Sequence, residues 1–152
     1  MSEYVATVEW TRGEQSFSDR RYSRAHDWRF DGGAVVRGSS APASVPAPMS
    51  DPAAVDPEEA LVAAVSSCHM LFFLDFAARA GLIVDRYTDE AVAVMGRDDR
   101  GKVAITEVTL RPAILFSGTL PDSATLDALH HRAHEACYIA NSIRAEVRIV
   151  SR

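Results

Sequence analysis

Residues 57–80 limit how this chain can fold more than any other segment of the sequence. The preceding Asp56 is a typical N-cap, Pro57 suits the first helical position, and Glu58 and Glu59 place acids in the first turn. Gly81 is a typical helix stop. A helix that is apolar on nearly all sides is predicted to be central, buried on several faces or at a subunit interface. The apolar positions are Leu61, Val62, Val65, Leu71, Phe72, Phe73, Leu74 and Phe76.

Charge and hydropathy exclude several classes of protein. The near-apolar run from Ala60 to Leu74 is shorter than the roughly 20 residues that cross a membrane, so it indicates a buried helix. The first residues, MSEYVATVEW, lack the apolar core of a secretory signal. The net charge of −5 argues against a surface that binds nucleic acid. We therefore expect a cytoplasmic protein with neither membrane nor nucleic-acid partners.

Alternating apolar and polar residues predict strands on both sides of this helix. A Pro-rich loop over residues 38–57 leads into the helix, and Pro121-Asp122-Ser123 begins a second helix. The predicted order β-β-β-α-β-β-α-β is an α+β fold with mostly antiparallel sheets, in a single domain over residues 1–152. The predicted strands lie within 4–10, 15–31, 34–37, 91–95, 103–116 and 143–150.

The chain has two cysteines, Cys68 and Cys137, and the spacing predicts that each lies in a helix. Free cysteine is often simply a small buried apolar residue. In a reducing compartment a cysteine pair is more often catalytic or metal-binding than a structural disulfide. The residues alone leave these three interpretations open.

Histidines near the cysteines keep a Cys/His zinc site among these alternatives. His69 follows Cys68, and His134 precedes Cys137. His130 and His134 have the spacing of an HExxH motif, but His131 occupies the glutamate position, so the catalytic base of that motif is absent. We expect His130 and His131 to lie on a solvated or partly buried helix face. The sequence contains no Gly-rich phosphate loop, dinucleotide fingerprint or GxSxG motif, so no cofactor is expected.

Glu58 and Cys68 lie roughly on one face of the first predicted helix. Their ten-residue separation spans about 15 Å along the axis, so a third group must connect them. An arginine can form a bidentate pair with the carboxylate and lie close to the thiol. Glu58 and Cys68 can therefore line one site only if such an arginine lies between them.

Two stretches of the chain resemble the motifs of the OsmC/Ohr family. DPEEALVAAVSSC, residues 56–68, is similar to the family's NPEE-L-x-A-A-x-x-x-C stretch, and AHEACYIANS, residues 133–142, resembles its AHxxCPxSxA stretch. Both occur in the family's order and at a similar separation. The resemblance is good from about Asp56 onward and loose over the N-terminal strands.

The resemblance implies an OsmC/Ohr-like fold in an intertwined homodimer, with a thiol peroxidase site at each subunit interface. Cys68 matches the peroxidatic cysteine, Cys137 the resolving cysteine, and Glu58 the glutamate that holds the catalytic arginine. The implied activity is reduction of organic hydroperoxides, with hydrogen peroxide as a further substrate, in defence against oxidative stress. A dithiol, which in the family can be a lipoylated protein, would then reduce the Cys68–Cys137 disulfide.

The sequence departs from the family pattern at three places. His69 follows the first cysteine, Tyr138 replaces the proline after the second, and the GGRxG turn that carries the arginine in the Ohr branch is absent. The chain therefore resembles a separate branch. Alternatives are a non-catalytic protein of this fold that binds a small apolar ligand, and the zinc protein.

Three arginines are candidates for the catalytic role. Arg24 is preferred, because Tyr22 and His26 flank it on a predicted strand, whereas Arg12 lies where the Ohr turn would be and Arg37 lies near the Pro-rich loop.

Overall fold

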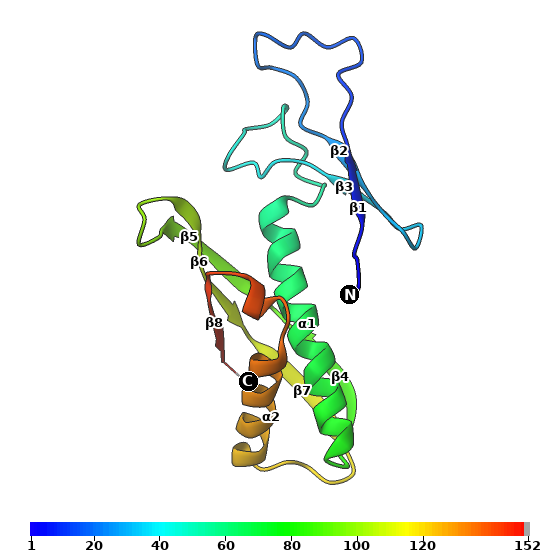
Figure 1. Ribbon diagram of the computed structural model, residues 1–152, viewed down its shortest axis with the longest axis vertical. Coiled ribbons are helices and arrows are strands. Elements are labelled where there is room, and N and C mark those ends of the chain that lie inside the picture. Colours follow the sequence, from blue (N-terminus) through cyan, green and yellow to red (C-terminus); the bar gives the residue numbers. More distant parts are fainter. Residues whose placement is uncertain (151–152) are drawn as a thin grey trace. The chain divides into compact units, whose positions relative to one another are not determined.

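The computed structural model describes residues 1–150, which group into two compact units divided after Ala60. Figure 1 shows their helices and strands in chain order. Helix α1 (Pro57–Arg79) begins in the first unit and continues through the second. The single domain over residues 1–152 stays a prediction.

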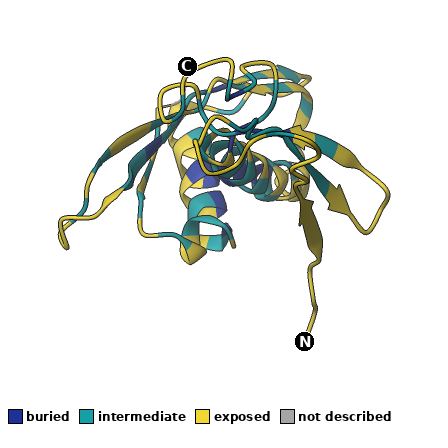
Figure 2. Ribbon diagram, turned by 90° about the horizontal axis from the view of Figure 1, so that it is seen from above, coloured by how far each residue is buried: buried dark blue, intermediate teal, exposed yellow. Residues whose placement is uncertain are grey.

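The N-terminal unit contains an antiparallel sheet of three short strands. These are β1 (Ala6–Glu9), β2 (His26–Phe30) and β3 (Val35–Gly38), with β2 in the centre. The turn between β2 and β3 includes Gly33, whose φ of 88° favours glycine. Every residue of β1 is exposed (Figure 2).

Backbone hydrogen bonds fix both ends of the Pro-rich segment between β3 and α1. The Ser39 amide donates to the Val55 carbonyl at 3.0 Å, and the Val55 amide donates to the Arg37 carbonyl at 3.0 Å. The buried hydroxyl of Ser39 accepts a hydrogen bond from the Asp51 amide at 2.9 Å. The segment is therefore held against the sheet despite its proline content.

A capping box fixes the start of α1 and confirms the predicted helix boundary. The Glu59 amide donates to Asp56 Oδ1 at 2.8 Å, and the Asp56 amide donates back to Glu59 Oε2 at 3.2 Å. Beyond Arg79 the chain turns at Gly81, whose φ is 76°. The prediction of a long helix between Pro57 and Gly81 is confirmed.

The second unit contains α2, a short 3₁₀ turn and five strands in two sheets. One sheet pairs β4 with β7, and the other has the order β5-β6-β8. All pairs are antiparallel except β6 with β8. The α+β class with mostly antiparallel sheets is confirmed. The elements are β4 (Ile83–Asp89), β5 (Val92–Arg97), β6 (Val103–Leu110), β7 (Pro112–Ser117), α2 (Ser123–Ala136), the 3₁₀ turn (Ala140–Ser142) and β8 (Glu146–Ile149).

The strand pattern between the helices differs from the prediction in two ways. Strand β4 is additional, because its charged residues and its bulge near Arg86 hide the period of two. The long strand predicted over 103–116 is two strands in different sheets. Proline has no amide hydrogen for a ladder, and Pro112 stands at the first position of β7, where the chain changes sheets.

Helix α1 buries a single stripe of residues spaced four apart. Its buried positions are Val65, His69, Phe73 and Ala77. The C-terminal half of this stripe packs with α2 and the β4–β7 sheet, and Val65 packs against β6. The helix therefore connects two apolar clusters of the second unit.

Much of the apolar surface of α1 stays uncovered in the single chain. Leu71, for example, is 63% exposed. By length and composition alone α1 could cross a membrane, a property it shares with the core helices of many soluble proteins. An exposed apolar surface of this kind is typical of an interaction surface.

Candidate functional site

The cysteine pair lies in the second unit, at the middle of α1 and the end of α2. Cys68 is partly exposed and follows Val65 by almost one helical turn. Cys137 is fully buried, and its Sγ lies 4.0 Å from the carbonyl oxygen of Val65. Both cysteines are free thiols. The fold thus brings together two residues that are far apart in the sequence.

The prediction that Cys137 lies inside a helix is wrong. Cys137 is the C-cap residue of α2. Its backbone is extended, with φ −66° and ψ 108°. The helix ends at Ala136, and the 3₁₀ turn that follows directs the Ala140 amide toward Cys137 Sγ at 3.4 Å. Because Cys137 follows the last helical residue, its side chain lies outside the buried stripe of α2 and points toward α1.

The two thiols differ in environment. Burial raises the pKa of Cys137, and a hydrogen bond with Cys68 raises it further, against the opposing effect of the Ala140 amide. Cys137 therefore stays protonated at neutral pH while Cys68 is the thiol open to solvent. This arrangement suits a pair in which Cys68 reacts first and Cys137 second.

Two histidines lie in the buried region beside the cysteines. His69 Nε2 and His130 Nδ1 are 3.0 Å apart, and both side chains are buried. The prediction that His130 lies on a solvated or partly buried helix face is wrong, because the residue follows Leu129 on the packed side of α2. His131 is exposed, as expected.

The histidines and cysteines do not form a metal-binding arrangement. Within residues 1–150 no group of three or more His, Cys, Asp or Glu side chains has a geometry that could hold a metal ion. The zinc alternative therefore has no ligand set in the described part of the chain.

Glu58 lies in the first turn of α1, and part of its carboxylate is buried. Its Oε2 has no hydrogen-bond partner within residues 1–150. A buried carboxylate oxygen without a donor is costly, so this position favours the approach of a cationic side chain. The sequence predicted such a partner, and its identity stays a prediction.

Arg24 lies in the N-terminal unit, in the segment before β2. Its Nη1 donates to the carbonyl oxygens of Arg20, at 2.9 Å, and Tyr22, and its guanidinium carbon lies 3.8 Å from the centroid of the Tyr22 ring. No carboxylate within residues 1–150 forms an ion pair with it. The guanidinium therefore keeps donors available for another anionic group.

The other two candidate arginines are already engaged. Arg37 lies between two carboxylates, 3.8 Å from Asp27 and 3.6 Å from Asp51. Arg12 Nη1 donates to the Gln15 carbonyl at 2.8 Å in an exposed turn. Neither Arg12 nor Arg24 has a carboxylate partner in the described residues, but Arg24 is the one that lines an aromatic cavity, which keeps it the preferred candidate.

A cluster of three aromatic residues in the N-terminal unit was not predicted as a functional feature. The Phe17 and Tyr22 rings stack with centroids 4.8 Å apart, and Trp10 meets Tyr22 at 5.3 Å. The three residues lie 5 to 7 positions apart in the loop between β1 and β2, a spacing without helical or strand period. Only the abundance of aromatic and arginine residues over 15–31 could have indicated the cluster.

Comparison with known proteins gives a family match and a closely similar structure. The family model described as OsmC-like protein matches residues 50–152. The structure of an OsmC-like protein of unknown function from Vibrio cholerae is 50% identical, with a TM-score of 0.98 and full coverage of both chains. A comparison with curated proteins gives no match.

More distant structures share the fold. The organic hydroperoxide resistance protein OhrB of Bacillus subtilis is 18% identical, with a TM-score of 0.69 over 99% of this chain and 98% of the other. An organic hydroperoxide resistance protein from Elizabethkingia anophelis is 17% identical, with a TM-score of 0.70 over 99% and 94% of the two chains. Two short motifs, the α+β fold and the family model lead to the same conclusion: this chain belongs to the OsmC-like protein family.

Proposed function

We propose that this protein is a thiol-dependent peroxidase that reduces organic hydroperoxides. The observation that carries the proposal is the contact between a partly exposed thiol, Cys68, and a buried, protonated thiol, Cys137. Family membership and the names of the distant structural neighbours support the same substrate class.

The reaction has three balanced steps. The Cys68 thiolate attacks one peroxide oxygen, the O–O bond breaks, and Cys68 becomes a sulfenic acid as the alkoxide leaves and takes up a proton. The Cys137 thiol then attacks the Cys68 sulfur, forming the disulfide and releasing water. A dithiol reductant restores both thiols by exchange and is itself oxidised.

The environments of the two cysteines support unequal roles. A peroxide arriving from solvent meets Cys68 before the buried Cys137. The raised pKa of Cys137 keeps it protonated, so it competes poorly for peroxide. Its position beside Cys68 lets it trap the sulfenic acid before further oxidation.

An arginine is required to favour the Cys68 thiolate and to stabilise the leaving alkoxide. We propose Arg24 for this role and Glu58 as the carboxylate that positions it. Arg24 has no carboxylate partner and Glu58 Oε2 has no donor in the described residues, so each has an unfilled interaction of the kind the other supplies.

We further propose that the protein acts as a cytoplasmic homodimer. The exposed apolar residues of α1, such as Leu71, give the helix a surface that a second copy can cover. The family resemblance implies an intertwined dimer in which the subunits complete each other's sites.

Hydroperoxide consumption with a dithiol reductant tests the proposal. Cumene hydroperoxide turnover should fall at least about 100-fold in Cys68→Ser, because the nucleophile is lost. Ser67→Ala is the matched control: among the described residues the Ser67 hydroxyl bonds only the Ala64 carbonyl, so turnover should be unchanged. Wild-type turnover by Cys68→Ser would end the proposal and would favour a non-catalytic ligand-binding protein.

The role of Arg24 needs its own comparison. Arg24→Gln should lower kcat/KM by about 100-fold if its guanidinium stabilises the transition state. Arg29→Gln, which removes an exposed arginine of β2, should have little effect. Equal losses in the two variants would exclude Arg24 as the activating group.

A further inference from the structure

We propose that the N-terminal unit contains a binding site for a small aromatic carboxylate, built from an aromatic cavity and the guanidinium of Arg24. The cavity has a volume of about 470 Å³, within the range of small-molecule sites. Its apolar wall includes Val8, Trp10, Phe17 and Tyr22, and Arg24 and His26 contribute polar groups. All of these residues belong to the N-terminal unit.

The aromatic wall favours a flat ring over an aliphatic chain. Phe17 and Tyr22 stack at 4.8 Å, and Trp10 meets Tyr22 edge-on at 5.3 Å. Trp10 stays 36% exposed and Phe17 52% exposed, so their ring surfaces are available. A further ring can add offset or edge-to-face contacts to this group.

Hydrogen bonds hold the polar edge of the cavity in place. The Trp10 indole donates to the Ser23 carbonyl at 2.8 Å. His26 Nδ1 donates to the Arg24 carbonyl at 2.7 Å, and its Nε2 accepts from the Trp28 indole at 2.7 Å. These contacts fix the backbone on both sides of Arg24, so the site does not have to be assembled by the ligand.

Arg24 supplies the recognition of an anion. Only Nη1 is engaged by carbonyl oxygens, so Nε and Nη2 have no acceptor among the described residues. These two groups form the fork that pairs with a carboxylate. The same guanidinium lies over the Tyr22 ring at 3.8 Å, which sets it at the edge of the aromatic wall.

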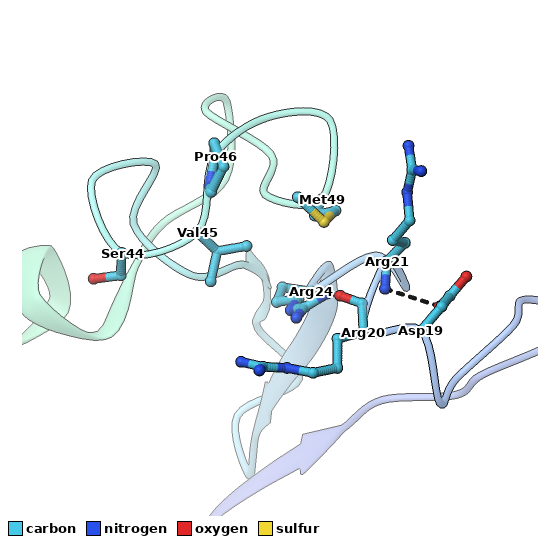
Figure 3. Close-up of a pocket in the computed structure, with 8 residues that line it drawn as sticks. All are labelled: Asp19, Arg20, Arg21, Arg24, Ser44, Val45, Pro46 and Met49. Atoms are coloured by element: carbon cyan, nitrogen blue, oxygen red, sulfur yellow. Dashed lines mark hydrogen bonds between the residues drawn. The ribbon is translucent and has the colours of Figure 1, made fainter.

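A second cavity, which Arg24 also lines, strengthens the preference for an anion. It has a volume of about 340 Å³ and is lined by Arg20, Arg21 and Asp19 together with Arg24. Figure 3 shows Arg24 between the turn at residues 19–21 and the segment at 44–49. Asp19 accepts a hydrogen bond from the Arg21 amide, and the three guanidinium groups leave an excess of positive charge. An anionic group is therefore favoured beside Arg24, the residue that lines both cavities.

Calorimetric titration of the reduced, full-length protein tests the site with three probes. They are 2-naphthoate, the neutral 2-naphthylmethanol and the aliphatic octanoate. We expect 2-naphthoate to bind at least about tenfold more tightly than either of the others, since it alone satisfies both halves of the site. Equal binding of the three probes, or no binding by a folded protein, would overturn the proposal. Absence of binding would overturn the proposal also where another copy of the chain covers Trp10.

Variants separate the two halves of the site. Arg24→Gln should abolish the preference for 2-naphthoate over the alcohol, and Trp10→Leu should weaken both. Arg29→Gln is the matched control and should change neither. Arg24 also donates to backbone carbonyls, so its replacement could disturb the fold, and Arg21→Gln serves as a second variant. Arg21→Gln should weaken the binding of the two carboxylate probes and leave that of the alcohol unchanged. Unchanged affinities in both arginine variants would contradict the site.

The binding measurement does not depend on the proposed peroxidase. If Arg24 also pairs with Glu58 and activates Cys68, 2-naphthoate should slow hydroperoxide consumption, because its carboxylate competes with Glu58 for the guanidinium. Binding without inhibition would count against the catalytic role of Arg24, whereas activity without binding would count against the site.

Discussion

The imidazole rings of His69 and His130 stack in the interior, with Nε2 of the first 3.0 Å from Nδ1 of the second. One ring nitrogen must donate its hydrogen and the other must accept through its lone pair, so at least one ring is neutral. The pair joins the middle of α1 to the middle of α2, one residue away from Cys68. The histidine pair therefore makes the packing around the two cysteines sensitive to pH.

Acid should destabilise the protein in a range set by this pair. Burial lowers the pKa of His69 from 6.5 to about 4, and the charges of His130 and His134 act in the same direction. Burial also lowers the pKa of His130, against the attraction of Asp127 and Asp89. The unfolded chain then binds more protons than the folded one as the pH falls from 6.5 toward 4. The free energy of unfolding should drop by roughly 2 kcal/mol between about pH 7.5 and pH 5, measured by urea denaturation.

Carboxylates do not account for a loss in this range. Asp98, Asp122 and Glu146 have lowered pKa values in the folded protein, so the stability they contribute is lost only at more acidic pH. A free energy of unfolding that stays constant between pH 7.5 and pH 5 would contradict a neutral, buried histidine pair.

Replacing one member of the pair should cost more than replacing both. His69→Leu leaves His130 Nδ1 buried without its partner, which should lower the free energy of unfolding by about 1–3 kcal/mol. The double variant with His130→Leu should recover part of that loss, because the orphaned nitrogen is removed. The exposed His131→Leu serves as the control and should change stability by no more than about 0.5 kcal/mol. Additive losses in the double variant would exclude the coupling.

Gly38 should tolerate no side chain, since a Cβ there would meet His26 Nε2 at 2.6 Å and Trp28 Nε1 at 2.8 Å. Gly38→Ala should break the hydrogen bond between these two rings and destabilise the N-terminal sheet by about 1–3 kcal/mol. Tryptophan fluorescence during urea unfolding gives the measurement. Gly32→Ala is the matched control, because no described atom lies within 4 Å of its added carbon. Similar stabilities for the two variants would show that the close approach is absent.

The half-buried carboxylate of Asp89, at the end of β4, should stabilise the second unit through two hydrogen bonds. Its Oδ2 accepts from the Ser66 hydroxyl at 2.5 Å, and its Oδ1 accepts from the Arg111 amide at 2.6 Å, where the chain changes sheets. Asp89→Ala should lower the free energy of unfolding by about 2–3 kcal/mol. Asp85→Ala, which loses a single exposed bond to Ser117, should cost well under half as much in the same denaturation experiment. An equal cost would mean that the Arg111 contact contributes nothing.

Local chemistry explains what the sequence could predict. The Asp56 cap and the Gly81 stop define α1 through contacts within a few residues, so its bounds followed from the residues alone. The pairing of Cys68 with Cys137 depends on how two helices pack, and only the family motifs indicated it. The end of α2 before Cys137 could not be predicted, because the 3₁₀ turn that follows has no apolar period.

Long-range packing explains what the sequence could not predict. His130 is one residue from the apolar stripe of α2, and the approach of His69 and Phe73 from α1 makes it buried rather than solvated. The availability of Arg24 likewise depends on where Asp27 and Asp51 fall, since they pair with Arg37 instead. Pro112 gave a signal for a break in the predicted strand, but not for the change from one sheet to another.

The disulfide itself gives the most direct test of the central claim. Reduced protein is treated with one equivalent of cumene hydroperoxide, the remaining thiols are alkylated, and the intact mass and peptide map are measured. We predict the loss of two hydrogen atoms and a single Cys68–Cys137 cross-linked peptide, with a sulfenic acid on Cys68 when Cys137→Ser is treated in the same way. Two alkylated, unoxidised thiols in the treated wild-type protein would contradict the account.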